Sequence, residues 1–84
     1  MYYIHIPNSV RKSIRKIPLP WQVRVLGALR QLRHDPYLGD KMSGDKKDKR
    51  KIRVWPYRIL YRLHEADKYI DIVEVGHRGH MSYD

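Results

Sequence analysis

Residues 49–61 read KRKIRVWPYRILY, and as a β-strand the first half of this stretch separates cationic from apolar side chains. Successive side chains of a strand point to opposite faces, which places Lys49, Lys51 and Arg53 together on one face. The isoleucine and valine between them then lie on the other face. This strand is therefore expected to have one apolar surface and one row of positive charge.

The second half of the stretch continues into RILYRLH and repeats the pattern after Pro56. Arg58 and Arg62 are expected on one face, and Ile59 and Tyr61 on the other. Two neighbouring strands that present cations to one surface form a platform for an anion, and nucleic acid is the obvious large anion. The alternative is a sheet edge that its charge protects from aggregation.

The charge of the whole chain agrees with a phosphate-binding surface. Lys and Arg number 18 against 9 Asp and Glu, which gives a net charge of +9 over 84 residues and a pI of about 10.0. This balance is typical of proteins that contact nucleic acid. Membrane binding fits less well, since the basic residues accompany apolar faces that a core would use. A solvated basic surface without a ligand is the remaining alternative.

Composition excludes several classes of protein. The chain has no Cys, so disulfides, a thiolate nucleophile and a cysteine zinc site are excluded. No apolar run reaches the roughly 18 residues of a membrane span, and the opening MYYIHIPNSV lacks the features of a signal peptide. We expect a single domain over residues 1–84, in the cytoplasm and without a membrane partner.

Hydrophobic spacing predicts the elements of this domain. They are, in chain order, a strand at 2–6, helices at about 9–17 and 20–34, a polar loop at 35–48, and strands at 49–55, 57–64 and 69–75. The last strand, YIDIVEV, is apolar on both faces and is expected at the centre of the sheet. Trp21 and Tyr61 are expected in the core. The predicted fold class is α+β, with a two-helix hairpin packed on one face of a small, largely antiparallel twisted sheet in the order βααβββ.

Four segments carry a resemblance to a known family: the helical hairpin, the loop DPYLGDKMSG, the strand pair KIRVWPYRILYRL and the terminal VEVGHRGHMSY. Together they resemble the RelE/ParE superfamily of toxin–antitoxin toxins, and more closely its RelE branch, over essentially the whole chain. The resemblance implies a type II toxin that inhibits translation as an endoribonuclease, entering the ribosomal A site and cutting mRNA. ParE-type members instead poison DNA gyrase, and a non-catalytic RNA-binding relative is a further alternative. The implied partners are a cognate antitoxin in a hetero-oligomer, the ribosome and its mRNA.

The resemblance also implies which residues are catalytic. Lys51 and Arg53 match the two basic residues before the YR motif, and Arg58 is the arginine of that motif. Arg78 follows the glycine turn, and Tyr83 matches a tyrosine a few residues later. The sequence departs from the RelE pattern at Arg53, where RelE has lysine, and in lacking a C-terminal helix beside Tyr83.

Metal-independent RNA cleavage gives these residues chemical roles. When a ribose 2′-OH attacks the adjacent phosphate, a protein need supply only a base, an acid and charge stabilisation. Arginines suit the phosphate because they bind it in a bidentate way and stabilise added charge. Crowding by neighbouring arginines should ease deprotonation of Lys51, which makes it the candidate base. His77 or His80 is the candidate acid, and the alternative is that both are turn histidines without a chemical role.

Other residues are expected to bind RNA without taking part in the reaction. Lys49 and Arg62 extend the cationic row along the RNA backbone. Trp55, Tyr57 and Tyr83 are candidates for stacking on unpaired bases. No cofactor is expected, and the spacing of the histidines matches no metal site.

Overall fold

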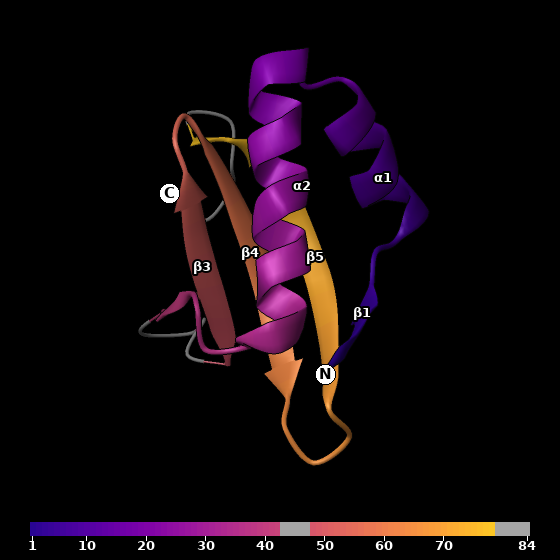
Figure 1. Cartoon of the computed structure of the whole chain (residues 1–84), viewed down its shortest axis with the longest axis vertical. Coiled ribbons are helices and arrows are strands. Elements are labelled where there is room, and N and C mark those ends of the chain that lie inside the picture. The colour runs from indigo at the N-terminus through magenta and orange to yellow at the C-terminus, as the bar shows by residue number, and fades with distance from the viewer. Residues whose placement is uncertain (43–47, 79–84) are drawn as a thin grey trace.

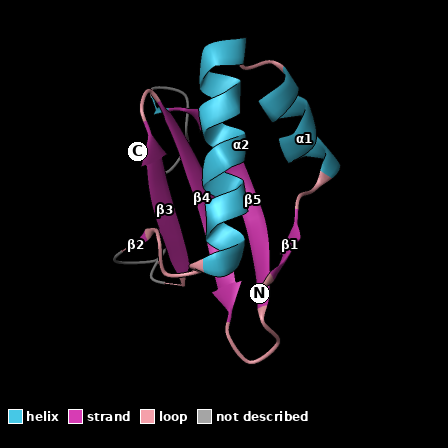
Figure 2. Ribbon diagram, viewed as in Figure 1, coloured by secondary structure: helices cyan, strands magenta, loops and turns pink. Residues whose placement is uncertain are grey.

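Two helices lie on one face of a twisted β-sheet (Figure 1). The computed structural model describes residues 1–42 and 48–78, and within this part of the chain the sheet has five strands in the order β1-β5-β4-β3-β2. The elements are β1 (Tyr3–His5), α1 (Asn8–Arg15), α2 (Leu19–His34), β2 (Asp40–Lys41), β3 (Lys49–Val54), β4 (Tyr57–His64) and β5 (Tyr69–His77). β1 runs parallel to β5, and the other neighbours are antiparallel. The predicted α+β class is confirmed (Figure 2).

Helix α1 forms because its apolar residues recur on one side. Val10 and Ile14 are buried, and Ile17, just beyond the end of the helix, is buried with them. The helix ends at Arg15, two residues earlier than expected. Pro18 disfavours helical backbone at the residue before it, so the turn that leads into α2 begins sooner.

Helix α2 begins with a proline in its first turn, where a missing N–H leaves no helical hydrogen bond unmade. Val25, Leu29 and Leu32 follow at helical spacing and are buried. The prediction that Trp21 lies in the core is wrong, since its side chain is 36% exposed. Trp21 stands in the first turn of the helix, one turn before the first buried position. Neither described helix is long and apolar enough to cross a membrane.

Strands β4 and β5 provide the sheet side of the core. Ile59 and Tyr61 of β4 and Ile70 and Ile72 of β5 are fully buried. The prediction that Tyr61 belongs to the core is confirmed. β5 lies between β1 and β4, so its predicted central position is also confirmed.

The hydroxyl of Tyr61 ties the loop after α2 to the sheet. It donates a hydrogen bond to the carbonyl of Pro36 at 2.8 Å and accepts one from the N–H of Gly39 at 3.0 Å. Burial raises the pKa of Tyr61. A Cβ at Gly39 would lie 2.8 Å from the Tyr61 ring, so only glycine lets the loop approach β4 this closely.

The observed sheet differs from the predicted order βααβββ in one short strand. Asp40 and Lys41, expected in a loop, pair with Lys51 and Arg50 as β2. Two residues of polar sequence carry no alternation from which a strand could be predicted. The partner strand β3 therefore determines this element.

A register shift between β4 and β5 also went unpredicted. Leu60 lies opposite Glu74, whereas the next residue, Tyr61, lies opposite Ile72. The extra residue on β5 is a β-bulge, which reverses the alternation beyond it. As a result Ile72 and Val75, three residues apart, are both buried on the helix side.

Candidate functional site

The face of the sheet away from the helices carries a row of cations, as the alternation predicts. We call it the cationic face and define it by Lys49, Lys51, Arg53, Arg58 and Arg62. The register of β3 and β4 sets Arg53 directly opposite Arg58. The preceding pair, Ile52 and Ile59, is buried under the helices. Because neighbouring pairs alternate between faces, Arg53 and Arg58 share the opposite one.

The Arg53 and Arg58 pair brings two cations together at one position of the cationic face. Directly opposed residues of an antiparallel pair have their Cβ atoms about 5 Å apart, and like charges in this position repel. An anion between the guanidinium groups relieves the repulsion and accepts their hydrogen bonds. Two guanidinium groups side by side are therefore suited to binding an anion such as a phosphate.

The next row of the face combines an amine, an apolar side chain and a carboxylate. Half-buried Lys51 lies opposite Leu60, and Leu60 lies opposite Glu74 on β5. Leu60 is only 3% exposed although it is outside the main core cluster. Sequence reasoning missed Glu74, because strict alternation assigns it to the same face as the buried Ile72. The bulge in β5 moves it to the cationic face, and no sequence signal marks that bulge.

Carboxylates partly neutralise the far end of the cationic face. Lys49 lies opposite Arg62, whose Nε donates to the carboxylate of Asp48 at 3.2 Å. Arg62 also lies opposite Asp71 of β5. The ion pair is solvent-exposed and contributes little to stability. At the other end, the described strand partners of Arg58 are Arg53 and Gly76, so the register sets no carboxylate directly opposite it.

Arg78 lies near the end of the cationic face that holds Arg53 and Arg58, beside the turn between β3 and β4. Trp55 and Pro56 form that turn, directly after the pair of Val54 and Tyr57. The N–H of Arg78 donates to the carbonyl of Pro56 at 3.0 Å, and its guanidinium carbon lies 4.2 Å from the centroid of the Trp55 ring. Sequence spacing did not predict this contact, since the two residues are far apart in the sequence.

The histidine next to Arg78 lies on the other face of the sheet. His77 is opposite Tyr57, and the two rings meet edge-on with their centroids 5.6 Å apart. Tyr57 packs against the core on the helix side. Arg58 faces away from His77, because its partner on β5 is Gly76. The other candidate residues near this end, His80 and Tyr83, lie outside the described residues.

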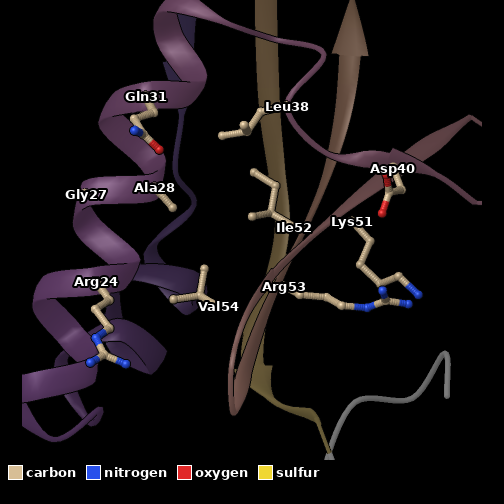
Figure 3. Close-up of a pocket in the computed structure, with 10 residues that line it drawn as sticks. All are labelled: Arg24, Gly27, Ala28, Gln31, Leu38, Asp40, Lys51, Ile52, Arg53 and Val54. Atoms are coloured by element: carbon tan, nitrogen blue, oxygen red, sulfur yellow. The ribbon is translucent and has the colours of Figure 1, made fainter.

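A cavity of about 700 Å³ adjoins the cationic face at the edge of the sheet. Gly27 and Ala28 of α2 line one side, and Ile52 and Val54 of β3 line the other. A Cβ built on Gly27 meets no atom within 4 Å, so this part of the cavity is open. Figure 3 shows that Lys51 and Arg53 extend away from α2.

The side chains that could take part in chemistry on the cationic face are positively charged ones, namely lysine and arginine. Over residues 1–42 and 48–78, no three His, Asp or Glu side chains gather as a metal site. Arginines at the β3–β4 turn, with a lysine one row away, form a set that can bind a phosphate group and stabilise added negative charge.

The arrangement of a helix pair on one face of this sheet is that of the RelE toxins. The RelBE2 toxin–antitoxin complex from Mycobacterium tuberculosis matches with a TM-score of 0.80 and 24% identity, over 92% of this chain and 98% of that chain. The isolated E. coli RelE toxin matches with a TM-score of 0.81 and 19% identity, over 99% and 90%. The RelE–RelB complex from Pyrococcus horikoshii OT3 matches with a TM-score of 0.75 and 24% identity, over 95% and 98%. At this level of sequence identity, the matches show that the chain shares the fold of these toxins.

The sequence comparison defines the family more narrowly. Residues 4–81 match the family described as the ParE toxin of the type II toxin–antitoxin system parDE. The chain therefore belongs to this toxin family, within the RelE/ParE superfamily. No curated protein matches the chain.

Proposed function

We propose that this toxin is an endoribonuclease that inhibits translation by cutting ribosome-bound mRNA in the cytoplasm. The observation that carries the proposal is the register of β3 and β4, in which Arg53 lies opposite Arg58 with Arg78 at the same end. Arginines gathered at one end of the face suit a phosphate that gains negative charge during a reaction, whereas binding a protein target does not need such a cluster.

The reaction begins when the 2′-OH of a ribose attacks the adjacent phosphorus. Lys51 accepts the proton of that hydroxyl, and the bond from phosphorus to the 5′-oxygen of the next nucleotide breaks. Arg53, Arg58 and Arg78 stabilise the charge that accumulates on the phosphate oxygens. The products are a 2′,3′-cyclic phosphate and a 5′-OH end, and no metal or cofactor takes part.

A general acid must protonate the leaving 5′-oxygen. His77 faces the helices beside Tyr57, so its position does not support this role. We assign the role to His80 or Tyr83, both in the segment that follows Arg78. Lys49 and Arg62 bind the RNA backbone at the other end of the cationic face.

The proposed inhibitor is the cognate antitoxin, in a hetero-oligomer with the toxin. The relatives of known structure include toxin–antitoxin complexes, among them RelBE2 and the archaeal RelE–RelB pair. An acidic antitoxin segment would be attracted to a chain of net charge +9 and would cover the cationic face. A complex in which the antitoxin contacts only the outer sides of the helices contradicts direct masking.

Inhibition of DNA gyrase is the second candidate function. The observation in its favour is the match of residues 4–81 to the ParE toxin family. In that case the cationic face would serve for binding, and substitutions in it would change affinity without any cleavage chemistry.

Induction of the toxin in cells separates the two functions. Primer extension across abundant mRNAs, combined with an assay for DNA breaks, follows expression of the parent and of the Arg58→Ala variant. The endoribonuclease proposal expects cuts in phase with codons in the parent and far fewer in the variant. DNA breaks with intact mRNA would select gyrase and reject the proposal.

A further inference from the structure

The turn between β3 and β4 presents an aromatic ring beside the arginines of the cationic face. Trp55 is 61% exposed and is not part of the core cluster. Tyr57, two residues on, packs against the core on the helix side. Of these two candidates for stacking, Trp55 is the more exposed, and Tyr57 is half-buried on the helix side.

The ring of Trp55 already contacts a cation on one of its faces. The guanidinium carbon of Arg78 lies 4.2 Å from the ring centroid, a distance typical of a cation–π contact. The backbone of Arg78 is bonded to Pro56 in the same turn. The turn therefore holds Arg78 by both its main chain and its side chain. Trp55 is nevertheless 61% exposed, so a ligand can reach part of its ring.

The register brings this ring close to the proposed phosphate position. Trp55 follows the last β3–β4 pair, Val54 and Tyr57, and the pair before it is Arg53 and Arg58. A nucleotide whose phosphate lies between the arginines has its base within reach of the turn. Unpaired bases of RNA bind to proteins largely by stacking on aromatic rings.

We propose that Trp55 is a stacking platform for one RNA base next to the phosphate that Arg53, Arg58 and Arg78 bind. The inference rests on the proposed endoribonuclease function and adds a base-binding subsite to it. The base occupies one face of the ring while Arg78 stays on the other. Stacking on a ring tolerates any base, so this subsite contributes affinity and position more than base identity.

The test uses tryptophan fluorescence in a background of Trp21→Phe, which leaves Trp55 as the sole tryptophan. Trp21 lies on α2, outside the cationic face. The ligand is a short single-stranded oligonucleotide with 2′-O-methyl riboses, which have no 2′-OH to attack the phosphate. The matched control is an abasic oligonucleotide with the same number of phosphates, at the same salt concentration. We expect the intact ligand to quench Trp55 and to bind about tenfold more tightly than the abasic one, as loss of a stacked base implies.

Two substitutions separate stacking from phosphate binding. The Trp55 variants contain no tryptophan in the Trp21→Phe background, so their affinities are measured from the fluorescence anisotropy of a labelled oligonucleotide. Trp55→Leu should bring the affinity ratio of intact to abasic ligand close to one, and Trp55→Phe should keep most of it. Arg78→Ala should weaken both ligands alike and leave the ratio unchanged. Equal binding of the two ligands by the parent, without quenching of Trp55, overturns the proposal.

The failure of this subsite is distinguishable from failure of the proposed function. If mRNA is cut in phase with codons but the intact and abasic oligonucleotides bind equally, the endoribonuclease proposal stands and the Trp55 stacking proposal is wrong. If the intact oligonucleotide binds more tightly than the abasic one but mRNA in cells stays intact, the Trp55 stacking proposal stands and the endoribonuclease proposal is wrong. If Trp55→Leu instead abolishes binding to gyrase while the ratio is one, Trp55 belongs to a protein interface and the proposal is wrong.

Discussion

Arg53 and Arg58 lie directly opposite each other on two neighbouring strands, and this arrangement is informative about function. Like charges directly opposite in a sheet destabilise it. The same geometry presents two guanidinium groups to one anion. A charge that accumulates in a transition state is stabilised most by donors that are already in position, because they need not reorganise during the reaction.

We expect Arg58→Ala to lower the rate of single-turnover mRNA cleavage on programmed ribosomes by about 10²- to 10³-fold, the usual effect of removing one such donor. The control is Lys12→Ala, an exposed cation on α1, for which the rate should not change. Parental rates in both variants would contradict the assigned role of Arg58.

We assign Lys51 and Arg53 different roles in cleavage, so replacing each one should change the cleavage rate in a different way. Lys51→Ala removes the proposed base, so the remaining cleavage rate should lose its dependence on pH near neutrality. Arg53→Ala removes a phosphate-binding group and should lower the rate while the pH profile keeps its shape. The measurement is the single-turnover rate from about pH 6 to pH 9, the range in which a proton-transfer catalyst works. Identical profiles for the two variants would contradict the assignment of the base.

Tyr61→Phe should destabilise the protein because it leaves two buried polar groups without a hydrogen-bond partner. Without the hydroxyl, the carbonyl of Pro36 and the N–H of Gly39 lose their partner. We expect a loss of about 1–3 kcal/mol in the free energy of unfolding, measured with urea. Tyr3→Phe, at a position 64% exposed, is the control and should change it little.

The raised pKa of Tyr61 adds a dependence on pH. The unfolded chain ionises this tyrosine near its ordinary value of 10.0, while the folded chain retains the proton. The contribution of the protonated Tyr61 hydroxyl to the free energy of unfolding is therefore complete below pH 10.0 and falls as the pH rises above it. The difference in stability between parent and Tyr61→Phe should narrow in the same range. A difference that stays constant there contradicts the burial of the hydroxyl.

At the scale of elements, two glycines show opposite constraints. Gly27 lies inside helix α2 beside open space, whereas Gly39 lies in the loop against the ring of Tyr61. Gly27→Ala should raise the free energy of unfolding by about 0.5–1 kcal/mol, because alanine restricts the unfolded chain and favours helix. Gly39→Ala should lower it by about 1–3 kcal/mol, since its Cβ would overlap the ring and the carbonyl of Lys51.

The two glycine predictions are tested by measuring the thermal unfolding of the Gly27→Ala and Gly39→Ala variants under identical conditions. Each is the other's control, since the chemical change is the same. A stabilising Gly39→Ala would mean that the loop lies farther from β4 than described.

At the scale of the whole molecule, net charge controls the rate of encounter with an acidic partner. A chain of net charge +9 attracts RNA or an acidic antitoxin segment over a distance that salt shortens. We expect the association rate with an acidic peptide, measured by stopped flow, to fall about tenfold or more as salt is raised from about 0.05 to 0.5 M.

The location of the charge can be tested separately from its amount. Arg53→Glu on the cationic face and Arg30→Glu on α2 both lower the net charge by two, and both residues are exposed. Arg53→Glu should slow association much more. Equal effects would show that the whole surface, and not the cationic face, attracts the partner.

The features that follow from the sequence alone are those governed by short-range periodicity. The alternation of KRKIRV and RILY is enough to predict that Arg53 and Arg58 share a face with Lys51, because the side chains of a strand repeat every two residues. The helical spacing of Val25, Leu29 and Leu32 predicts the buried side of α2 in the same way. The α+β class follows from the order of these periodic segments.

Only the tertiary structure decides what depends on contacts between distant residues. The bulge in β5 brings Glu74 to the cationic face, and β2 forms because β3 offers it a partner. Arg78 reaches Trp55 through a hydrogen bond to Pro56, far away in sequence, while His77 turns to the helix side. Periodicity describes one strand at a time, whereas register and the meeting of side chains depend on the packing of several elements at once.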